Sequence, residues 1–244
     1  MLKGEKYTKY TSTPLTFYIH NLSNGSSISD KNIILDLDET LIHTFSDSEV
    51  SNINKVGLFN HPLFRSRYYT LNLSSEGKDT DYYHGIFRPY YKQFLRFCLQ
   101  YFKHVIVWSA GETEYVHAVV DKLFKDLPEP FAVFTRPDCV QENKRYIKPL
   151  SKIFESLKEY DISGYNTFIL DDNEHTFIKN PYNSIHIPAF DFDKYNNKCF
   201  TFNQYENYLT NDECLRQVEM WMKKDYVLSC KDVKILDRTN LFYT

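Results

Sequence analysis

The feature that most constrains this chain is a pair of aspartates, one residue apart, at the end of a short apolar run. Ile33-Ile34-Leu35 is followed directly by Asp36-Leu37-Asp38-Glu39-Thr40. Side chains at positions i and i+2 of a strand point the same way, so Asp36 and Asp38 could both face a crevice at the carboxyl end of a parallel sheet. One carboxylate of such a pair can attack phosphorus while the other handles the leaving-group proton. The pattern therefore favours a chain that removes phosphate groups.

Length and composition indicate a globular α/β protein. The chain has 244 residues, of which 42% are hydrophobic, which suits one domain with insertions. Its formal net charge is −3 and it has no long basic run, so we expect neither a nucleic-acid partner nor an anionic membrane. No apolar stretch approaches the roughly 20 residues of a transmembrane helix, and the first residues do not resemble a signal peptide. The sequence therefore predicts a soluble protein.

The cysteines and histidines indicate in which cellular compartment the protein lies and whether it binds zinc. The five cysteines are widely spaced and form no C-x-x-C pair, which favours reduced thiols in the cytoplasm or the nucleus. The histidines have no paired ligand spacing, so zinc is not expected. His43 follows the acidic motif, and we favour a structural role for it over substrate contact. The cysteines are Cys98, Cys139, Cys199, Cys214 and Cys230.

Apolar periodicity predicts that strands and helices alternate after the acidic motif. Such alternation indicates a doubly wound parallel sheet, with helices on both faces and a ligand crevice beyond the carboxyl ends of the strands. The predicted strands are Val105–Trp108, Phe131–Phe134, Thr167–Leu170 and Ser184–Ile187. A first helix is predicted to begin near Pro89, and three more are predicted at Glu112–Lys125, Pro149–Tyr160 and about Asp212–Lys224.

The flanking segments and one insertion are harder to interpret. Residues 1–30 are predicted to be an N-terminal extension with a short strand at Thr16–His20, and residues 225–244 a C-terminal tail. The catalytic domain would then span residues 31–224. A small β insertion is predicted at 45–87, because the helical period is absent there. Its predicted strands, Tyr68–Leu73 and Tyr82–Phe87, are separated by a turn at Ser74–Asp79.

A second acidic pair, Asp171-Asp172, follows the strand predicted at Thr167–Leu170. On its own this pair is also typical of an ordinary turn. Two acidic pairs at one edge of a sheet repel each other unless a cation or protonation relieves them. A hard cation such as Mg²⁺ prefers such oxygen ligands. Metal binding is therefore the simpler interpretation.

Two more segments could serve phosphoryl chemistry at the same edge. Ser109-Ala110-Gly111 ends a predicted strand and could offer a hydroxyl and backbone N–H groups to phosphate oxygens, although a helix cap is the ordinary alternative. Lys148 lies just before a predicted helix. A lone lysine is usually a solvated surface charge. A fixed ammonium together with a divalent cation is nevertheless the arrangement that phosphoryl transfer reuses.

Six segments, taken in order, resemble one known family. They resemble the haloacid-dehalogenase-type phosphatases of the FCP/SCP group over roughly residues 32–222. That group acts on the carboxyl-terminal domain of RNA polymerase II and on other phosphoproteins. The segments are Asp36-Leu37-Asp38-Glu39-Thr40-Leu41-Ile42-His43, Arg88-Pro89, Ser109-Ala110-Gly111, Arg136-Pro137-Asp138-Cys139-Val140, Tyr146-Ile147-Lys148-Pro149-Leu150 and Leu170-Asp171-Asp172.

The resemblance implies a division of roles among the polar residues. Asp36 would be the nucleophile that forms an aspartyl-phosphate, and Asp38 the general acid and then the general base. Thr40 and Ser109 would fix the loop and the phosphoryl oxygens. Lys148 would neutralise charge on the transferring group.

The resemblance also implies a Mg²⁺ site. Asp36, the backbone carbonyl of Asp38 and Asp172 would hold the ion. Asp171 would support either the metal site or Lys148.

The sequence departs from the family pattern in two places. Tyr90 stands where a glycine is common after the Arg-Pro pair. No BRCT-like domain follows the core, which favours the small, single-domain type. Only the insertion at 45–87 could cover the site, so we expect an open crevice that suits a phosphorylated peptide.

The leading interpretation is a Mg²⁺-dependent phosphoserine/phosphothreonine protein phosphatase, with the RNA polymerase II C-terminal domain among its candidate substrates. A phosphatase for nucleic-acid ends or small-molecule phosphates is the alternative on the same fold. An inactive scaffold that only binds phosphoproteins is the alternative of another class. Such a scaffold would not need both Asp36 and Asp38.

Overall fold

The computed structural model describes residues 8–12, 15–19, 27–73, 81–192 and 201–242. The predicted turn at Ser74–Asp79 and the residues His20 and Cys199 lie outside these ranges. Within the described ranges, no helix is long and apolar enough to cross a membrane, and Cys98, Cys139, Cys214 and Cys230 carry free thiols.

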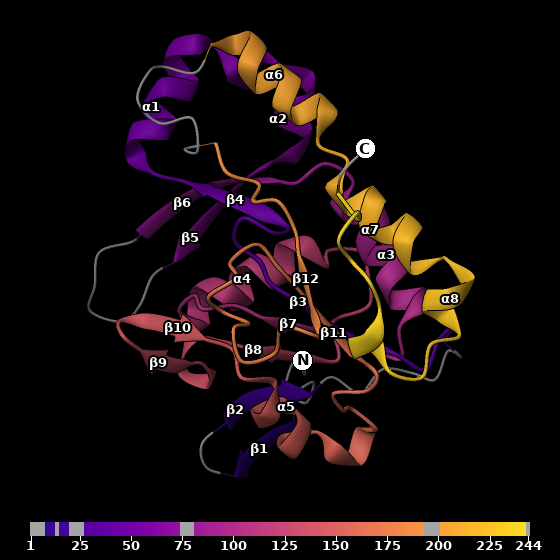
Figure 1. Ribbon diagram of the computed structural model, residues 1–244. Coiled ribbons are helices and arrows are strands. Elements are labelled where there is room, and N and C mark those ends of the chain that lie inside the picture. The colour runs from indigo at the N-terminus through magenta and orange to yellow at the C-terminus, as the bar shows by residue number, and fades with distance from the viewer. Residues whose placement is uncertain (1–7, 13–14, 20–26, 74–80, 193–200, 243–244) are drawn as a thin grey trace.

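A seven-stranded sheet forms the centre of the molecule, in the order β1-β2-β8-β7-β3-β11-β12 (Figure 1). Five neighbouring strands of this sheet are mutually parallel, which confirms the predicted parallel sheet; they are β8, β7, β3, β11 and β12. β2 joins β8 antiparallel, and β1 pairs antiparallel with β2, so the N-terminal extension widens the sheet. The strands are β1 (Thr8–Ser12), β2 (Leu15–Ile19), β3 (Asn32–Leu35), β7 (His104–Trp108), β8 (Ala132–Phe134), β11 (Thr167–Asp171) and β12 (Ser184–His186).

Helices cover both faces of the sheet because successive strand residues point to opposite sides. Ile33 and Leu35 of β3 belong to the large core that includes α3, α4 and α7, whereas Ile34 belongs to a second core with α5. The predicted helices are confirmed, although the first begins at Tyr91 and not at Pro89. The helices are α3 (Tyr91–Tyr101), α4 (Thr113–Leu123), α5 (Leu150–Ser156) and α7 (Cys214–Met222).

The insertion contains a sheet, as predicted, but the prediction that it lacks helices is wrong. The sheet is antiparallel in the order β4-β6-β5, and its first strand begins at Ile42, before the predicted start of the insertion at residue 45. Two α-helices and a 3-10 turn precede β5. These elements are β4 (Ile42–Phe45), α1 (Asp47–Val56), η1 (Leu58–Asn60), α2 (Pro62–Arg67), β5 (Tyr68–Leu73) and β6 (Asp81–Phe87).

The first of these helices, α1, had a sequence signal that apolar periodicity does not detect. Ser46 and Glu49 form a reciprocal capping box at its start, and Gly57 ends it in the left-handed conformation at φ 71°. Its buried residues are only Glu49 and Ile53. A helix with so short an apolar stripe shows little period in the sequence.

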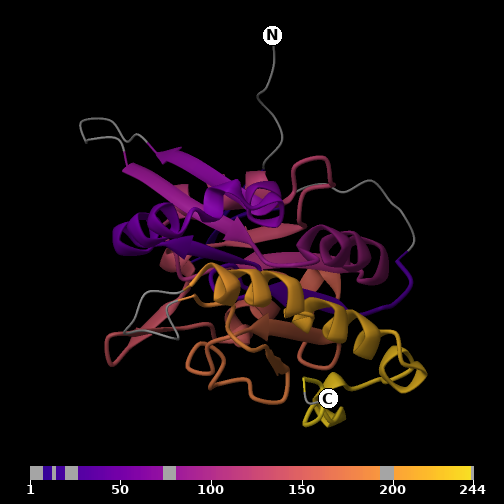
Figure 2. The same ribbon diagram turned by 90° about the horizontal axis from the view of Figure 1, so that it is seen from above.

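The remaining elements tie the insertion and the C-terminal segment to the core. Aromatic residues of the insertion pack with α6 in a third core, and α6 leads into α7 along one side of the molecule (Figure 2). Val227, Val233 and Leu236 of the predicted tail join the large core. These elements are η2 (Arg136–Asp138), β9 (Val140–Glu142), β10 (Arg145–Ile147), η3 (Lys158–Tyr160), α6 (Phe202–Asn211), α8 (Asp225–Leu228) and η5 (Val233–Ile235).

Tyr90 adopts a backbone conformation that favours glycine, at φ 65° and ψ 5°. Arg216 lies over its ring, 5.1 Å from the centroid, and both Tyr90→Gly and Tyr90→Ala lose that contact. The left-handed conformation costs a residue with a Cβ about 1 kcal/mol, whereas glycine adopts it freely. We therefore expect Tyr90→Gly to exceed Tyr90→Ala in free energy of unfolding by about 1 kcal/mol, measured by urea denaturation. Equal stability of the two variants would contradict the strain.

Candidate active site

A buried lysine joins the two acidic strand ends. The Nζ atom of Lys148 lies 2.5 Å from Oδ1 of Asp36 and 2.7 Å from Oδ2 of Asp171. All three side chains are buried, with Lys148 exposed by 1%. β3 and β11 are hydrogen-bonded neighbours, so the residues at their carboxyl ends meet. Lys148 is therefore a fixed internal cation and not the solvated surface charge that is usual for lysine.

The carboxyl groups of Asp36 and Asp172 resist ionisation. Burial raises the pKa of Asp36 well above its ordinary value, although Lys148 acts in the opposite direction. Burial, followed by repulsion from Asp171, raises the pKa of Asp172 to about 7. Burial alone would lower the pKa of Lys148, but Asp171 and Asp36 raise it. One lysine thus leaves negative charge at this edge that is not fully compensated.

The three aspartates at this edge fit a metal ion. Asp36, Asp171 and Asp172 each offer a carboxylate oxygen, and these oxygens lie within 4.8 Å of one another. An all-oxygen donor set suits a hard cation, and the raised pKa values show that additional positive charge would stabilise the ionised forms. The described residues thus include an acidic cluster that could bind a metal.

Thr40 connects the Asp36 loop to the second acidic pair. Its hydroxyl accepts from the backbone N–H of Asp172 at 3.1 Å and faces Oδ1 of the same residue at 3.4 Å. Thr40 is fully buried and does not line the surface hollow. The side chain therefore holds the two loops together.

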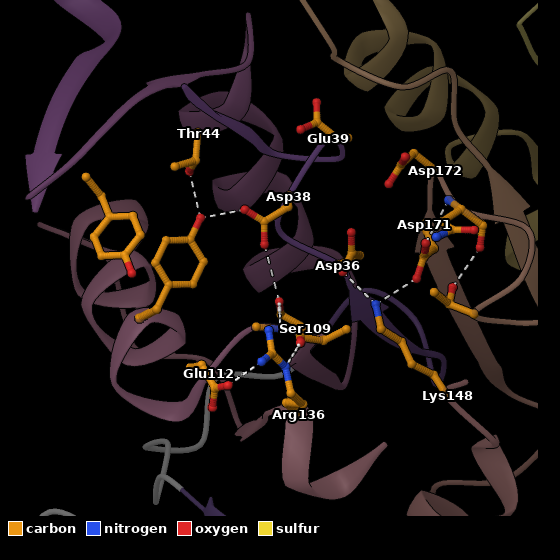
Figure 3. A pocket seen from close by; sticks show the side chains of 16 residues that line it. Asp36, Asp38, Glu39, Thr44, Ser109, Glu112, Arg136, Lys148, Asp171 and Asp172 are labelled. Carbon is orange, nitrogen blue, oxygen red and sulfur yellow. Dashed lines mark hydrogen bonds and ion pairs between the residues drawn. The ribbon is translucent and has the colours of Figure 1, made fainter. Parts of the chain in front are cut away.

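A hollow opens beside Lys148, and Asp38 lies on its wall (Figure 3). Ser109 donates its hydroxyl to Oδ2 of Asp38 at 3.4 Å and accepts from the backbone N–H of Gly111 at 3.0 Å. Glu112, and not Ser109, is the N-cap residue of α4. The hollow is lined by Asp36, Asp38, Glu39, Thr44, Tyr83, Ser109, Ala110, Gly111, Glu112, Tyr115, Arg136, Lys148, Asp171, Asp172, Asn173 and Thr176.

The structure therefore brings together most of the predicted site residues. Asp36, Asp38, Ser109 and Lys148 line one hollow together with both members of the second acidic pair. Thr40 lies behind the hollow.

Sequence reasoning missed Tyr115, which donates its hydroxyl to Oδ1 of Asp38 at 2.5 Å. Tyr115 is in the first turn of α4, four residues before Val119, which is buried on the same helix. This spacing indicates burial, but it does not identify the partner of the hydroxyl. Tyr83 of the insertion also lines the hollow beside Tyr115, with ring centroids 5.3 Å apart.

Arg88 is structural. Its guanidinium is buried and donates to the backbone carbonyls of Thr40 at 3.1 Å and Pro188 at 2.7 Å. It also pairs with Asp212 at 3.0 Å. Arg136, in contrast, lines the hollow, where it pairs with Glu112.

His43 is buried between two carboxylates, a position that suits the predicted structural role. Its Nδ1 lies 2.8 Å from Glu39 and its Nε2 lies 2.9 Å from Glu49. Burial alone would lower the pKa of His43, but the hydrogen bonds to these two carboxylates raise it to about 10. His43 therefore anchors the loop at residues 36–40, the acidic loop, to α1.

Comparisons with known proteins show which proteins this chain resembles. The family model of the NLI interacting factor-like phosphatases matches residues 31–219. A probable C-terminal domain small phosphatase of Dictyostelium discoideum is 27% identical over 164 residues, which cover 67% of this chain and 45% of the relative. CTD nuclear envelope phosphatase 1 of Xenopus tropicalis is 28% identical over 175 residues, which cover 68% of this chain and 61% of the relative. The chain thus spans less than two thirds of either relative.

Two solved structures share the fold. A variant of the fission yeast RNA polymerase II CTD phosphatase Fcp1, bound to beryllium fluoride, matches with a TM-score of 0.58 and 15% identity, over 85% of this chain and 69% of that chain. Another structure of Fcp1 matches with a TM-score of 0.54 and 19% identity, over 86% of this chain and 59% of that chain. These matches confirm the predicted haloacid-dehalogenase-like fold.

The His43 cation predicts a specific pH dependence of stability. Because its pKa is raised from 6.5 to about 10, its contribution is fully present below pH 6.5 and is lost as the pH rises toward 10. We expect the difference in free energy of unfolding between wild type and His43→Gln to shrink by at most about 1.4 kcal/mol per pH unit across this range. Urea denaturation of both proteins at pH 6.5, 8 and 9.5 measures it. A difference that stays constant with pH would contradict a charged His43.

Proposed function

This chain belongs to the NLI interacting factor-like phosphatase family, and on that premise we propose that it is a Mg²⁺-dependent phosphoserine/phosphothreonine protein phosphatase. The observation that carries the proposal is the hollow in which Lys148, Asp36 and the second acidic pair face Asp38. A nucleophile, a proton donor and positive charge thereby share one space. An inactive binding scaffold would need only the last of these.

We assign the metal to Asp36, Asp172 and the backbone carbonyl of Asp38. Asp171 is already paired with Lys148 at 2.7 Å, so we give it a supporting role. Bound there, Mg²⁺ would supply positive charge to the phosphoryl oxygens and keep the carboxylates ionised.

The chain's own residues carry the first half of the reaction. A carboxylate oxygen of Asp36 attacks phosphorus, and the bond between phosphorus and the seryl or threonyl oxygen breaks. The proton carried by Asp38 moves to the departing oxygen, which leaves as an alcohol. The products are an aspartyl-phosphate and an ionised Asp38. Burial raises the pKa of Asp38, which favours the protonated form that this step requires.

The second half regenerates the enzyme. Ionised Asp38 takes a proton from water as the water oxygen attacks phosphorus, and the bond between phosphorus and Asp36 breaks. Phosphate leaves, Asp36 is again a carboxylate, and Asp38 is again protonated. Lys148 stays charged throughout and faces the attacking carboxylate.

We propose a phosphoprotein as the substrate partner. Tyr83 of the insertion and Tyr115 of α4 line the hollow, so apolar side-chain surface flanks the phosphoryl site. Several relatives are C-terminal domain phosphatases by name, and we extend that class to this chain, with the C-terminal domain of RNA polymerase II among the candidates. The free thiols among the described cysteines support a cytoplasmic or nuclear location.

We expect EDTA to abolish hydrolysis of 4-nitrophenyl phosphate and added Mg²⁺ to restore it, because the acidic cluster needs a cation to remain ionised. Release of 4-nitrophenol measures both effects. Full activity in chelator would contradict the metal site.

Substitution of the two aspartates of the first motif should impair different steps of the reaction. We expect Asp36→Asn to abolish the phosphoenzyme, which acid quenching with a ³²P-labelled substrate detects. Asp38→Asn should slow seryl phosphates more than aryl phosphates, because a phenolate leaves with less help from a proton. An Asp36→Asn protein with near-wild-type turnover would exclude Asp36 as the nucleophile.

Peptides should be better substrates than small phosphates. We expect higher kcat/KM for phosphoserine peptides, including Ser-Pro repeats, than for sugar phosphates or nucleotides, since flanking residues add binding energy. Tyr83→Ala should raise KM for the peptides roughly tenfold, as the loss of about 1.4 kcal/mol of aromatic contact would, and should spare aryl phosphates. Tyr82→Ala is the matched control, because Tyr82 is 67% exposed on the same strand and lies outside the hollow. A nucleotide hydrolysed far better than every phosphopeptide would contradict the assignment.

A further inference from the structure

A chain of hydroxyl groups runs from the insertion to Asp38. The hydroxyl of Tyr115 lies 2.5 Å from Oδ1 of Asp38, and Oγ1 of Thr44 lies 2.7 Å from the same tyrosine oxygen. The hydroxyl of Tyr69 lies 3.3 Å from Oγ1 of Thr44. Tyr69 and Tyr115 are both buried, so little water competes for these bonds. Three hydroxyls from β5, β4 and α4 thus end on one carboxyl oxygen.

The acceptor at the end of the chain sets its direction. An ionised carboxylate can only accept, so Tyr115 donates its single proton to Asp38. The oxygen of Tyr115 then accepts from Thr44, and Thr44 can accept from Tyr69. Each hydroxyl donates toward Asp38, and bonds in such a series strengthen one another.

The two oxygens of Asp38 are therefore not equivalent. Among the described residues, Tyr115 holds Oδ1 at 2.5 Å, whereas Ser109 faces Oδ2 at the longer distance of 3.4 Å. Figure 3 shows the two contacts on opposite sides of the carboxyl group, with the Ser109 side toward the centre of the site. A proton on Oδ1 would have to reverse the direction of the hydroxyl chain.

We propose that Tyr115 is a positioning residue for the general acid: with Thr44 and Tyr69, it keeps Oδ1 of Asp38 as an acceptor, so that Oδ2 carries the proton transferred to the leaving oxygen. This inference rests on the proposed function, in which Asp38 is the acid. The sheet β4-β6-β5 then supports catalysis as well as binding, because Thr44 and Tyr69 both lie on its strands.

Gly85 allows the outer end of this chain to form. It pairs with Tyr69 across β6 and β5, and a Cβ at this position would lie 2.3 Å from Cζ and 2.4 Å from the hydroxyl oxygen of Tyr69. Any larger residue would therefore displace the Tyr69 hydroxyl. Gly85 does not line the hollow, so Gly85→Ala perturbs the chain from outside the site.

The test compares substrates whose leaving groups differ in basicity. We expect Tyr115→Phe to lower kcat for a phosphoserine peptide roughly tenfold, as the loss of about 1.4 kcal/mol from a charge-assisted hydrogen bond would. KM should change little, and 4-nitrophenyl phosphate should be affected much less, because nitrophenolate leaves without the proton. Thr44→Val and Gly85→Ala should show the same selectivity more weakly, whereas Thr44→Ser, which keeps the hydroxyl, should behave as wild type.

Tyr101→Phe is the matched control. Its hydroxyl is buried and donates to the backbone carbonyl of Met222 at 2.6 Å, away from the hollow. This variant loses a comparable hydrogen bond and should keep the wild-type ratio of peptide to aryl activity.

Equal slowing of both substrates by Tyr115→Phe, or no slowing of either, would overturn the proposal. If wild type hydrolyses no phosphate ester at all, the proposed function fails and the catalytic role of Tyr115 fails with it. The hydrogen bond itself is then decided by thermal unfolding of Tyr115→Phe, Asp38→Ala and the double variant. Losses in melting temperature that are less than additive support the contact, and additive losses exclude it.

Discussion

The ion pair between Lys148 and two aspartates is the interaction on which the site depends. The lysine is buried between the carboxyl ends of β3 and β11, and it holds Asp36 at 2.5 Å and Asp171 at 2.7 Å. Removing such charges from water costs several kcal/mol per ion, and the mutual attraction repays this only with close geometry. A buried triad of this kind adds little to stability, so its value to the protein lies in the chemistry that it prepares.

Contacts with α6 and with the acidic loop help to explain the position of the insertion. Its Phe45, Ile53 and Phe64 share a hydrophobic core with residues of α6. His43 joins Glu39 of the acidic loop to Glu49 of α1. These contacts hold β4 beside the hollow. Tyr83 of the insertion and Tyr115 of α4, which are distant in sequence, therefore lie side by side in the lining of the hollow.

Much of the sheet and of the acidic edge could be predicted from the sequence, because strand ends in a parallel sheet must meet at one side. Asp36 and Asp171 are predicted to lie close together on this ground alone. The same reasoning could not find α1, where a buried Glu49 takes a position that an apolar residue usually holds. Nor could it assign Tyr115, because its partner Asp38 is 77 residues away and helical periodicity carries no information on hydrogen bonds.

The contacts of Arg88 affect the entropy change when the acidic loop binds a ligand. The guanidinium binds the carbonyl oxygens of Thr40 and Pro188 and pairs with Asp212, so three distant segments hold the acidic loop in one conformation. The conformational entropy of the loop is therefore lost during folding and not on ligand binding. Backbone amides of this loop should exchange with deuterium about as slowly as those of β3, which would mark the acidic loop as part of the most protected unit of the protein.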